Sequence, residues 1–143
     1  MAAKGRNLLY QRGDGEGFLV TVAGARGLPR LHVVNVGVVG DRLFTFVQAT
    51  SAKARDLEAD GRYALHAHQD PAAPGEFMVR GRAKLVEDPD LRGEIAKDWF
   101  FNVSESYPLY ELLIEHALLG ERGADEWPPR YRSWRHRLTR VRR

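Results

Sequence analysis

The alternation of apolar and polar residues predicts a chain built mainly of strands. The clearest example is the segment 77–85, where Phe77, Val79, Ala83 and Leu85 have one parity and Arg80, Arg82 and Lys84 have the other. Successive side chains of a strand point to opposite faces, so this segment predicts a half-buried strand with a basic outer face.

Five further segments have the composition of strands and are separated by turns rich in glycine or proline. They are residues 18–23, 30–39, 43–48, 62–68 and 132–141. In the second, Gly37 indicates either a β-bulge or a group packed closely against the backbone. Residues 1–15 are expected to form an N-terminal arm, with a short helix at residues 8–10, and residues 70–75 a loop.

Three segments have helical signals. The first begins at Ser51 and ends near residue 59, before Asp60-Gly61. The second follows Asp88-Pro89, a capping residue with a proline in the first turn. The third is expected over 106–120, from the spacing of Leu109, Leu112, Leu113, Ala117 and Leu119. Six strands joined mainly by hairpins predict a mainly β fold, an antiparallel barrel with helices.

Composition narrows the class of protein. The chain has 143 residues, 43% of them hydrophobic and 29% charged, which is typical of one globular domain covering 1–143. It has no cysteine, so disulfides and thiolate metal sites are excluded. We find no apolar run of the kind that forms a signal peptide or a membrane span, and we therefore expect a cytoplasmic protein without a membrane partner.

The net charge of +3 is concentrated in the arginine-rich segment that begins at Arg130. Such a segment is found in nucleic-acid sites, which bind with a steep dependence on salt. Because Trp134, Leu138 and Val141 are spread through it, we interpret it instead as a strand with a solvated arginine face and expect no nucleic-acid partner.

The junction between the strand 43–48 and the helix at Ser51 is the best candidate binding site. A helix start carries backbone N–H groups without partners, and these favour an anion. Ser51 can cap the helix, whereas Lys53 in its first turn opposes the helix dipole. A bound phosphate explains that lysine, and a capped helix with a solvated lysine is the alternative.

No set of catalytic side chains is evident, and we assign no catalytic residue. His66 and His68 share a strand face but have no third ligand nearby, so we expect no metal site. The serines lack the sequence context of a nucleophile. Any chemistry would therefore come from a bound cofactor.

The ordered segments GLPRLHVVNVGVV, GD, LFTFVQ, TSAKARDLEADGRYALHAH and FMVRGRAKLVEDPDLRGEI, with the closing RLTRVRR, resemble the pyridoxamine 5'-phosphate oxidase-like family of flavin-binding split barrels. The resemblance covers about residues 18–143. It implies a homodimer of six-stranded split barrels with cofactor sites at the subunit interface.

The resemblance also implies which residues bind the cofactor. Ser51 and Lys53 would hold its phosphate, and the second strand would line the flavin ring with His32, Val33, Val34 and Asn35. Gln48, Ala49 and Thr50 would add contacts. A C-terminal aromatic residue would approach from the partner chain, with Trp134 as first candidate and Trp127 as second.

Departures from the family pattern argue against vitamin B6 oxidation. Ala52 replaces an arginine and Asn35 a lysine, and the C-terminal arginine–histidine signature is not reproduced; Arg55 could compensate for the missing arginine. The expected function is an oxidoreductase that binds FMN, or a deazaflavin coenzyme, and acts on a small molecule. The face with Arg80, Arg82 and Lys84 could hold the acidic tail of a deazaflavin. The alternative is a flavin-binding or sensor module without turnover.

Overall fold

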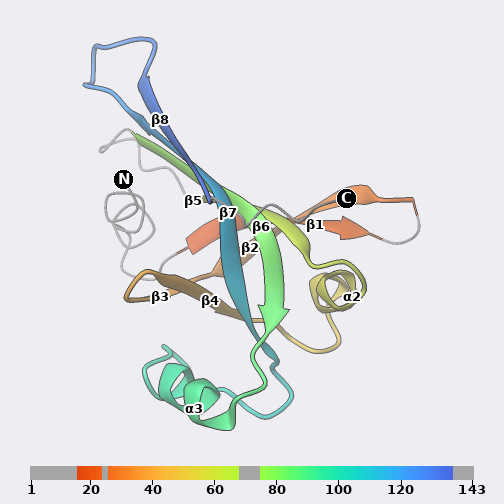
Figure 1. Ribbon diagram of the computed structural model, residues 1–143. Helices are drawn as coiled ribbons and strands as arrows, with labels where there is room; N and C mark the ends of the chain where they lie inside the picture. The colour runs from red at the N-terminus through yellow and green to blue at the C-terminus, as the bar shows by residue number, and fades with distance from the viewer. Residues whose placement is uncertain (1–15, 24–25, 68–74, 137–143) are drawn as a thin grey trace.

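The computed structural model describes residues 16–23, 26–67 and 75–136, which form a curved antiparallel sheet with two helices against it (Figure 1). The chain order of the elements is β1 (Glu16–Ala23), β2 (Leu28–Asn35), β3 (Gly37–Val39), β4 (Arg42–Phe46), α2 (Ala52–Ala59), β5 (Arg62–Ala67), β6 (Gly75–Leu85), α3 (Pro89–Lys97), β7 (Leu109–Glu121) and β8 (Arg130–Arg135). The predicted arm of residues 1–15 and most of the loop 70–75 lie outside the described residues.

The sheet has the strand order β2-β1-β5-β6-β7-β4-β3, and all of its pairs are antiparallel. Strand β7 pairs with β6 along its whole length. On its other edge, its first residues pair with β4 and its last residues pair with β8. The described residues thus form a half-barrel of eight strands, so the expected number of six is wrong.

Part of this difference comes from the predicted strand 30–39, which is two strands. The chain breaks at Val36 between β2 and β3, and β3 pairs with β4. The hydroxyl of Thr45 donates to the carbonyl of Asn35 at 2.8 Å, which supplies a partner where the ladder is interrupted. Gly37 lies against the ring of Trp99, so the second of our two interpretations of this glycine, a closely packed group, is confirmed.

The predicted third helix is wrong, because residues 109–121 form strand β7. A β-bulge explains the error. Arg80 pairs with His116 and Gly81 with Ile114, so Glu115 is an extra residue that reverses the parity of the strand. Before Glu115, the even-numbered residues of β7 point toward the core, and after it the odd-numbered residues do. The resulting spacing of leucines along the sequence resembles that of a helix.

Helix α3 agrees with the prediction. Asp88 caps it by accepting from the N–H of Asp90 at 2.9 Å, and Pro89 stands in the first turn. Its side chains Leu91 and Ile95 join Trp99 in a cluster against β4 and the start of β7. The main core lies on the concave side of the sheet and includes Leu19, Leu43, Leu65, Val79 and Leu112, each at most 1% exposed.

The arginine-rich segment forms strand β8 over 130–135, as expected of a strand with a solvated arginine face. Arg130 pairs with Glu126 and Arg132 with Glu121. Residues 137–141 of the predicted strand lie outside the described part of the chain. No helix among the described residues has the length and hydropathy needed to cross a membrane.

Candidate functional site

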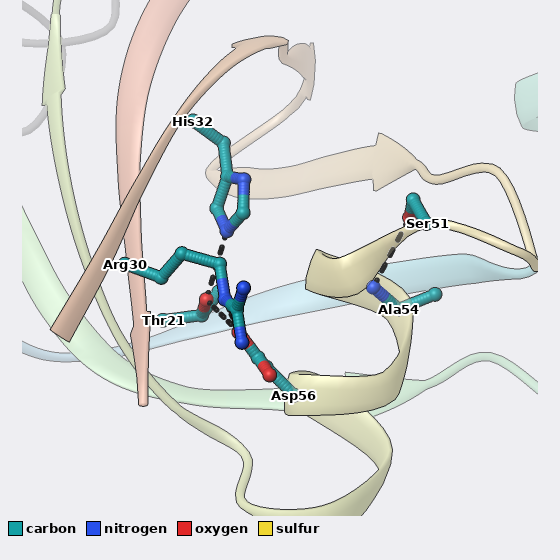
Figure 2. Close-up of polar contacts among 6 residues, drawn as sticks. All are labelled: Thr21, Arg30, His32, Ser51, Ala54 and Asp56. Atoms are coloured by element: carbon teal, nitrogen blue, oxygen red, sulfur yellow. Dashed lines mark hydrogen bonds and ion pairs between the residues drawn. The ribbon is translucent and has the colours of Figure 1, made fainter. Parts of the chain in front are cut away.

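The start of helix α2 has the cap that the sequence predicts. The hydroxyl of Ser51 accepts from the N–H of Ala54 at 3.2 Å (Figure 2). It also donates to the carbonyl of Gln48 at 2.6 Å. The second bond ties the loop after β4 to the helix. Ser51 is therefore already engaged on both sides, and its structural role as a cap is established.

Lys53 is half-buried in the first turn of α2 and makes no ion pair within the described part of the chain. Helix geometry also leaves the N–H groups of Ala52 and Lys53 without partners inside the helix. Arg55, one turn on, donates to the carbonyl of Thr50 at 3.0 Å, so this guanidinium supports the loop. A cation and free N–H groups lie together here, which suits an anionic ligand.

A buried polar network fixes α2 to the sheet. Asp56 is 5% exposed, and its carboxylate accepts from the hydroxyl of Thr21 at 2.7 Å and from Nε of Arg30 at 2.9 Å (Figure 2). A buried carboxylate is stable only when such donors compensate for lost hydration. The network therefore sets the position of the helix relative to β1 and β2.

His32 on β2 belongs to the same network. Its Nε2 lies 3.0 Å from Oγ1 of Thr21. The single hydroxyl proton of Thr21 is donated to Asp56, so Thr21 accepts from His32 and the imidazole proton is on Nε2. This leaves Nδ1 of the neutral ring as an acceptor.

The surroundings of His32 lower its pKa. Burial is the main cause, and the positive charge of Lys53 adds to it, while Asp56 acts in the opposite direction. Of the predicted residues, His32 on β2 and Lys53 at the helix start are thus near enough to interact electrostatically. His32 is mostly neutral at pH 7.

The structure divides the four predicted residues of β2 between two faces. His32 and Val34 point toward the core and α2, whereas Val33 and Asn35 point to the opposite face. Val33 is 66% exposed and its neighbour Leu31 is 67% exposed, on an edge strand of the sheet. Gln48, Ala49 and Thr50 lie in the exposed loop that leads to Ser51.

Trp134 does not lie with these residues within one chain. It pairs with Ala117 across β8 and β7 and is 44% exposed. Together with Leu43 and Phe77 it lines a cavity of about 540 Å³ that shares no described residue with the start of α2. Trp127, the second candidate, is 78% exposed in the loop before β8.

Thr21, Arg30 and Asp56 are site residues that the sequence reasoning missed. Thr21 has the inward parity of Leu19, and Arg30 that of His32, so the strand pattern contained a partial signal. Asp56 lies in sequence between Ala54 and Leu57, which are both buried. This local context does not indicate that Asp56 contacts Thr21 and Arg30. No group of three or more histidine, aspartate or glutamate side chains in the described ranges is arranged to hold a metal ion.

No protein-family model matches the sequence, and no curated protein matches it. Solved structures do match. A heme binding protein from Mycobacterium smegmatis has a TM-score of 0.68 at 19% identity, over 94% of this chain and 58% of that protein. This chain thus spans little more than half the length of that relative.

Two other structures cover most of both chains. A Listeria innocua protein assigned as a pyridoxamine 5'-phosphate oxidase has a TM-score of 0.66 at 21% identity, over 81% of this chain and 94% of that one. An F420 reductase has a TM-score of 0.56 at 20% identity, over 71% of this chain and 87% of that one. The chain therefore has the split-barrel fold of the pyridoxamine 5'-phosphate oxidase-like proteins, as the sequence resemblance implied.

Proposed function

We propose that this chain binds FMN, or a deazaflavin coenzyme in its place, through a phosphate at the start of α2. The observation that carries the proposal is Lys53, a half-buried cation that makes no ion pair with any described carboxylate and lies beside a capped helix start. The likeness in fold to an F420 reductase and to the Listeria innocua protein supports the same ligand class.

The residues at this position fit a phosphate group. Lys53 and the N–H groups of Ala52 and Lys53 would hold the phosphate. The flavin or deazaflavin supplies hydride and electron transfer when it is bound. The chain itself anchors and orients the ligand and excludes water from part of it, and we propose an oxidoreductase that acts on a small molecule.

A second copy of the chain would complete the site. The outer face of edge strand β2 exposes Leu31 and Val33, each about two-thirds exposed. Such an apolar patch on an edge strand is a typical protein interface. We propose that two chains pair as a homodimer and that Trp134 reaches the site of the other chain.

The alternative is a module that binds the cofactor without turnover. It is favoured by the fixed geometry of two titratable groups of this site, His32 and Asp56. Thr21 and Arg30 hold these two side chains, which are therefore poorly placed to transfer protons. Reduction of the bound cofactor by NADPH or by reduced deazaflavin, with sustained turnover, distinguishes the enzyme from the carrier.

The first experiment is the absorption spectrum of the purified protein, with mass analysis of any molecule that heat releases. Flavin or deazaflavin bands with the corresponding mass support the proposal. A heme spectrum would instead agree with the relative from Mycobacterium smegmatis and contradict it.

A titration with FMN tests the site itself. Lys53→Ala removes a charge-assisted contact of about 1.5–3 kcal/mol, which raises Kd about ten- to a hundredfold. Lys97→Ala, which removes an exposed lysine from α3, is the matched control and leaves Kd unchanged. Equal affinities in wild type and Lys53→Ala would refute the phosphate assignment.

A further inference from the structure

Three basic side chains lie side by side on the face of the sheet opposite the core. Arg80 on β6 pairs with His116 on β7, and His116 pairs with Arg135 on β8. Directly opposed residues on neighbouring strands point to the same face, with Cβ atoms about 4.5–5.5 Å apart. Figure 1 shows the three strands running together. We call these three residues the basic row.

The two arginines of the basic row differ from the other arginines of this region. Those others have carboxylate partners: Arg62 pairs with Asp60 at 2.7 Å, Arg82 with Glu115 at 3.9 Å and Arg132 with Glu121 at 3.0 Å. The side chains of Arg80 and Arg135 form no ion pair or hydrogen bond within residues 16–23, 26–67 and 75–136. Arg80 and Arg135 each stand opposite His116, so two positive charges without ion-pair partners flank one ring, and such a row favours an anion.

His116 between them has an unsatisfied nitrogen. Its Nδ1 is buried and finds no hydrogen-bond partner among the described residues. Such nitrogens are uncommon in folded proteins. Burial lowers the pKa of His116, and the charges of Arg135 and Arg80 lower it further.

The residues next to the row in the sheet are short and uncharged. On the far side of Arg80 the register continues to Ala64 on β5 and Val20 on β1, both of them short side chains. Glu115, the bulge residue next to His116, is already engaged by Arg82. No carboxylate among the described residues forms an ion pair with the row.

We infer that the basic row binds an oxyanion group, phosphate or carboxylate, of a small ligand. Two arginines and an imidazole provide convergent donors, and the planar guanidinium fits both oxyanions in a bidentate manner. This site shares no residue with the start of α2 and stands independently of the flavin proposal.

The test is an NMR titration of the full chain with inorganic phosphate, and separately with acetate, at constant ionic strength. The ring signals of His116 are assigned with the variant His116→Gln. We expect a saturable shift of these signals with at least one of the two anions. Arg80→Gln and Arg135→Gln should each weaken binding about tenfold, the loss expected for one charge-assisted contact.

The control is Arg132→Gln, which also removes one arginine from β8 but leaves the basic row intact. Binding that survives in the control and is lost in the row variants supports the inference, and the more effective anion identifies the ligand chemistry. A linear shift, or equal losses in all three variants, would show a general charge effect and overturn the inference.

Sedimentation velocity of the wild type and of the row variants is a second measurement. If phosphate and acetate fail to bind and the row variants dissociate the oligomer, the row pairs with a carboxylate of a second chain and the small-ligand site is refuted.

Discussion

The hydroxyl of Thr21 on β1 donates to the carboxylate of Asp56 on α2, with 2.7 Å between Oγ1 and Oδ2. Both side chains are buried, at 0% and 5% exposure. This contact fixes the helix that carries Ser51 and Lys53 against the sheet, and it holds His32 in place through the same hydroxyl. The geometry of the candidate site thus depends on two residues that would not themselves bind the ligand.

Asp56→Ala should destabilise the fold, because it leaves the buried hydroxyl of Thr21 without an acceptor. The expected loss is about 1–3 kcal/mol in the free energy of unfolding, measured in urea. Glu58→Ala, on the exposed side of the same helix, should change it by less than about 0.5 kcal/mol. The double variant Thr21→Val with Asp56→Ala should lose less than the sum of the single variants. Strict additivity would show that the contact contributes nothing.

Ser51 can be tested separately as a helix cap and as part of a phosphate site. Ser51→Ala removes the cap and should lower the free energy of unfolding by about 1 kcal/mol. Ser51→Asp keeps a capping oxygen and should preserve stability, but its negative charge should repel a phosphate and weaken FMN binding. An Asp variant that is stable and binds FMN as well as wild type would remove the phosphate from this position.

Gly37→Ala should disturb the contact between β3 and the end of α3. A Cβ atom at Gly37 would lie 2.7 Å from Cζ3 of Trp99, so the indole ring must move. We expect a loss of about 1–3 kcal/mol in unfolding free energy and a change in tryptophan fluorescence. Gly93→Ala is the matched control, because nothing lies within 4 Å of its Cβ position in α3. Gly93→Ala should leave the unfolding free energy unchanged or raise it slightly. If Gly37→Ala also leaves it unchanged, the indole ring of Trp99 has space to move.

The lowered pKa of His32 predicts how stability depends on pH. The pKa of this ring in the folded chain lies below the ordinary histidine value of 6.5, so the unfolded chain takes up a proton first as the pH falls. The stability that neutral His32 contributes is complete above about pH 6.5 and is lost as the pH falls through the folded pKa. Urea unfolding between pH 7.5 and 5 measures this slope. His32→Gln, which keeps an N–H donor for Thr21, should reduce the slope, whereas an unchanged slope would assign the dependence to other groups.

The sequence by itself determined several local features. Ser51 and Asp88 were recognisable as caps because their side chains satisfy N–H groups of their own helices, a contact within three residues. Strand β6 was recognisable because it is half-buried and so alternates strictly. The order of such segments was also enough to indicate the split-barrel fold.

Only the tertiary structure decided what depends on distant parts of the chain. Residues 109–121 form a strand because β6, β4 and β8 pair with them, and the bulge at Glu115 conceals this in the sequence. Asp56 is buried against Thr21 and pairs with Arg30, 35 and 26 residues away, and no local pattern specifies such partners. The basic row likewise arises from the register of three strands. Local hydrogen bonds and periodicity can be read along a chain, whereas burial and charge pairing across strands exist only once the chain has folded.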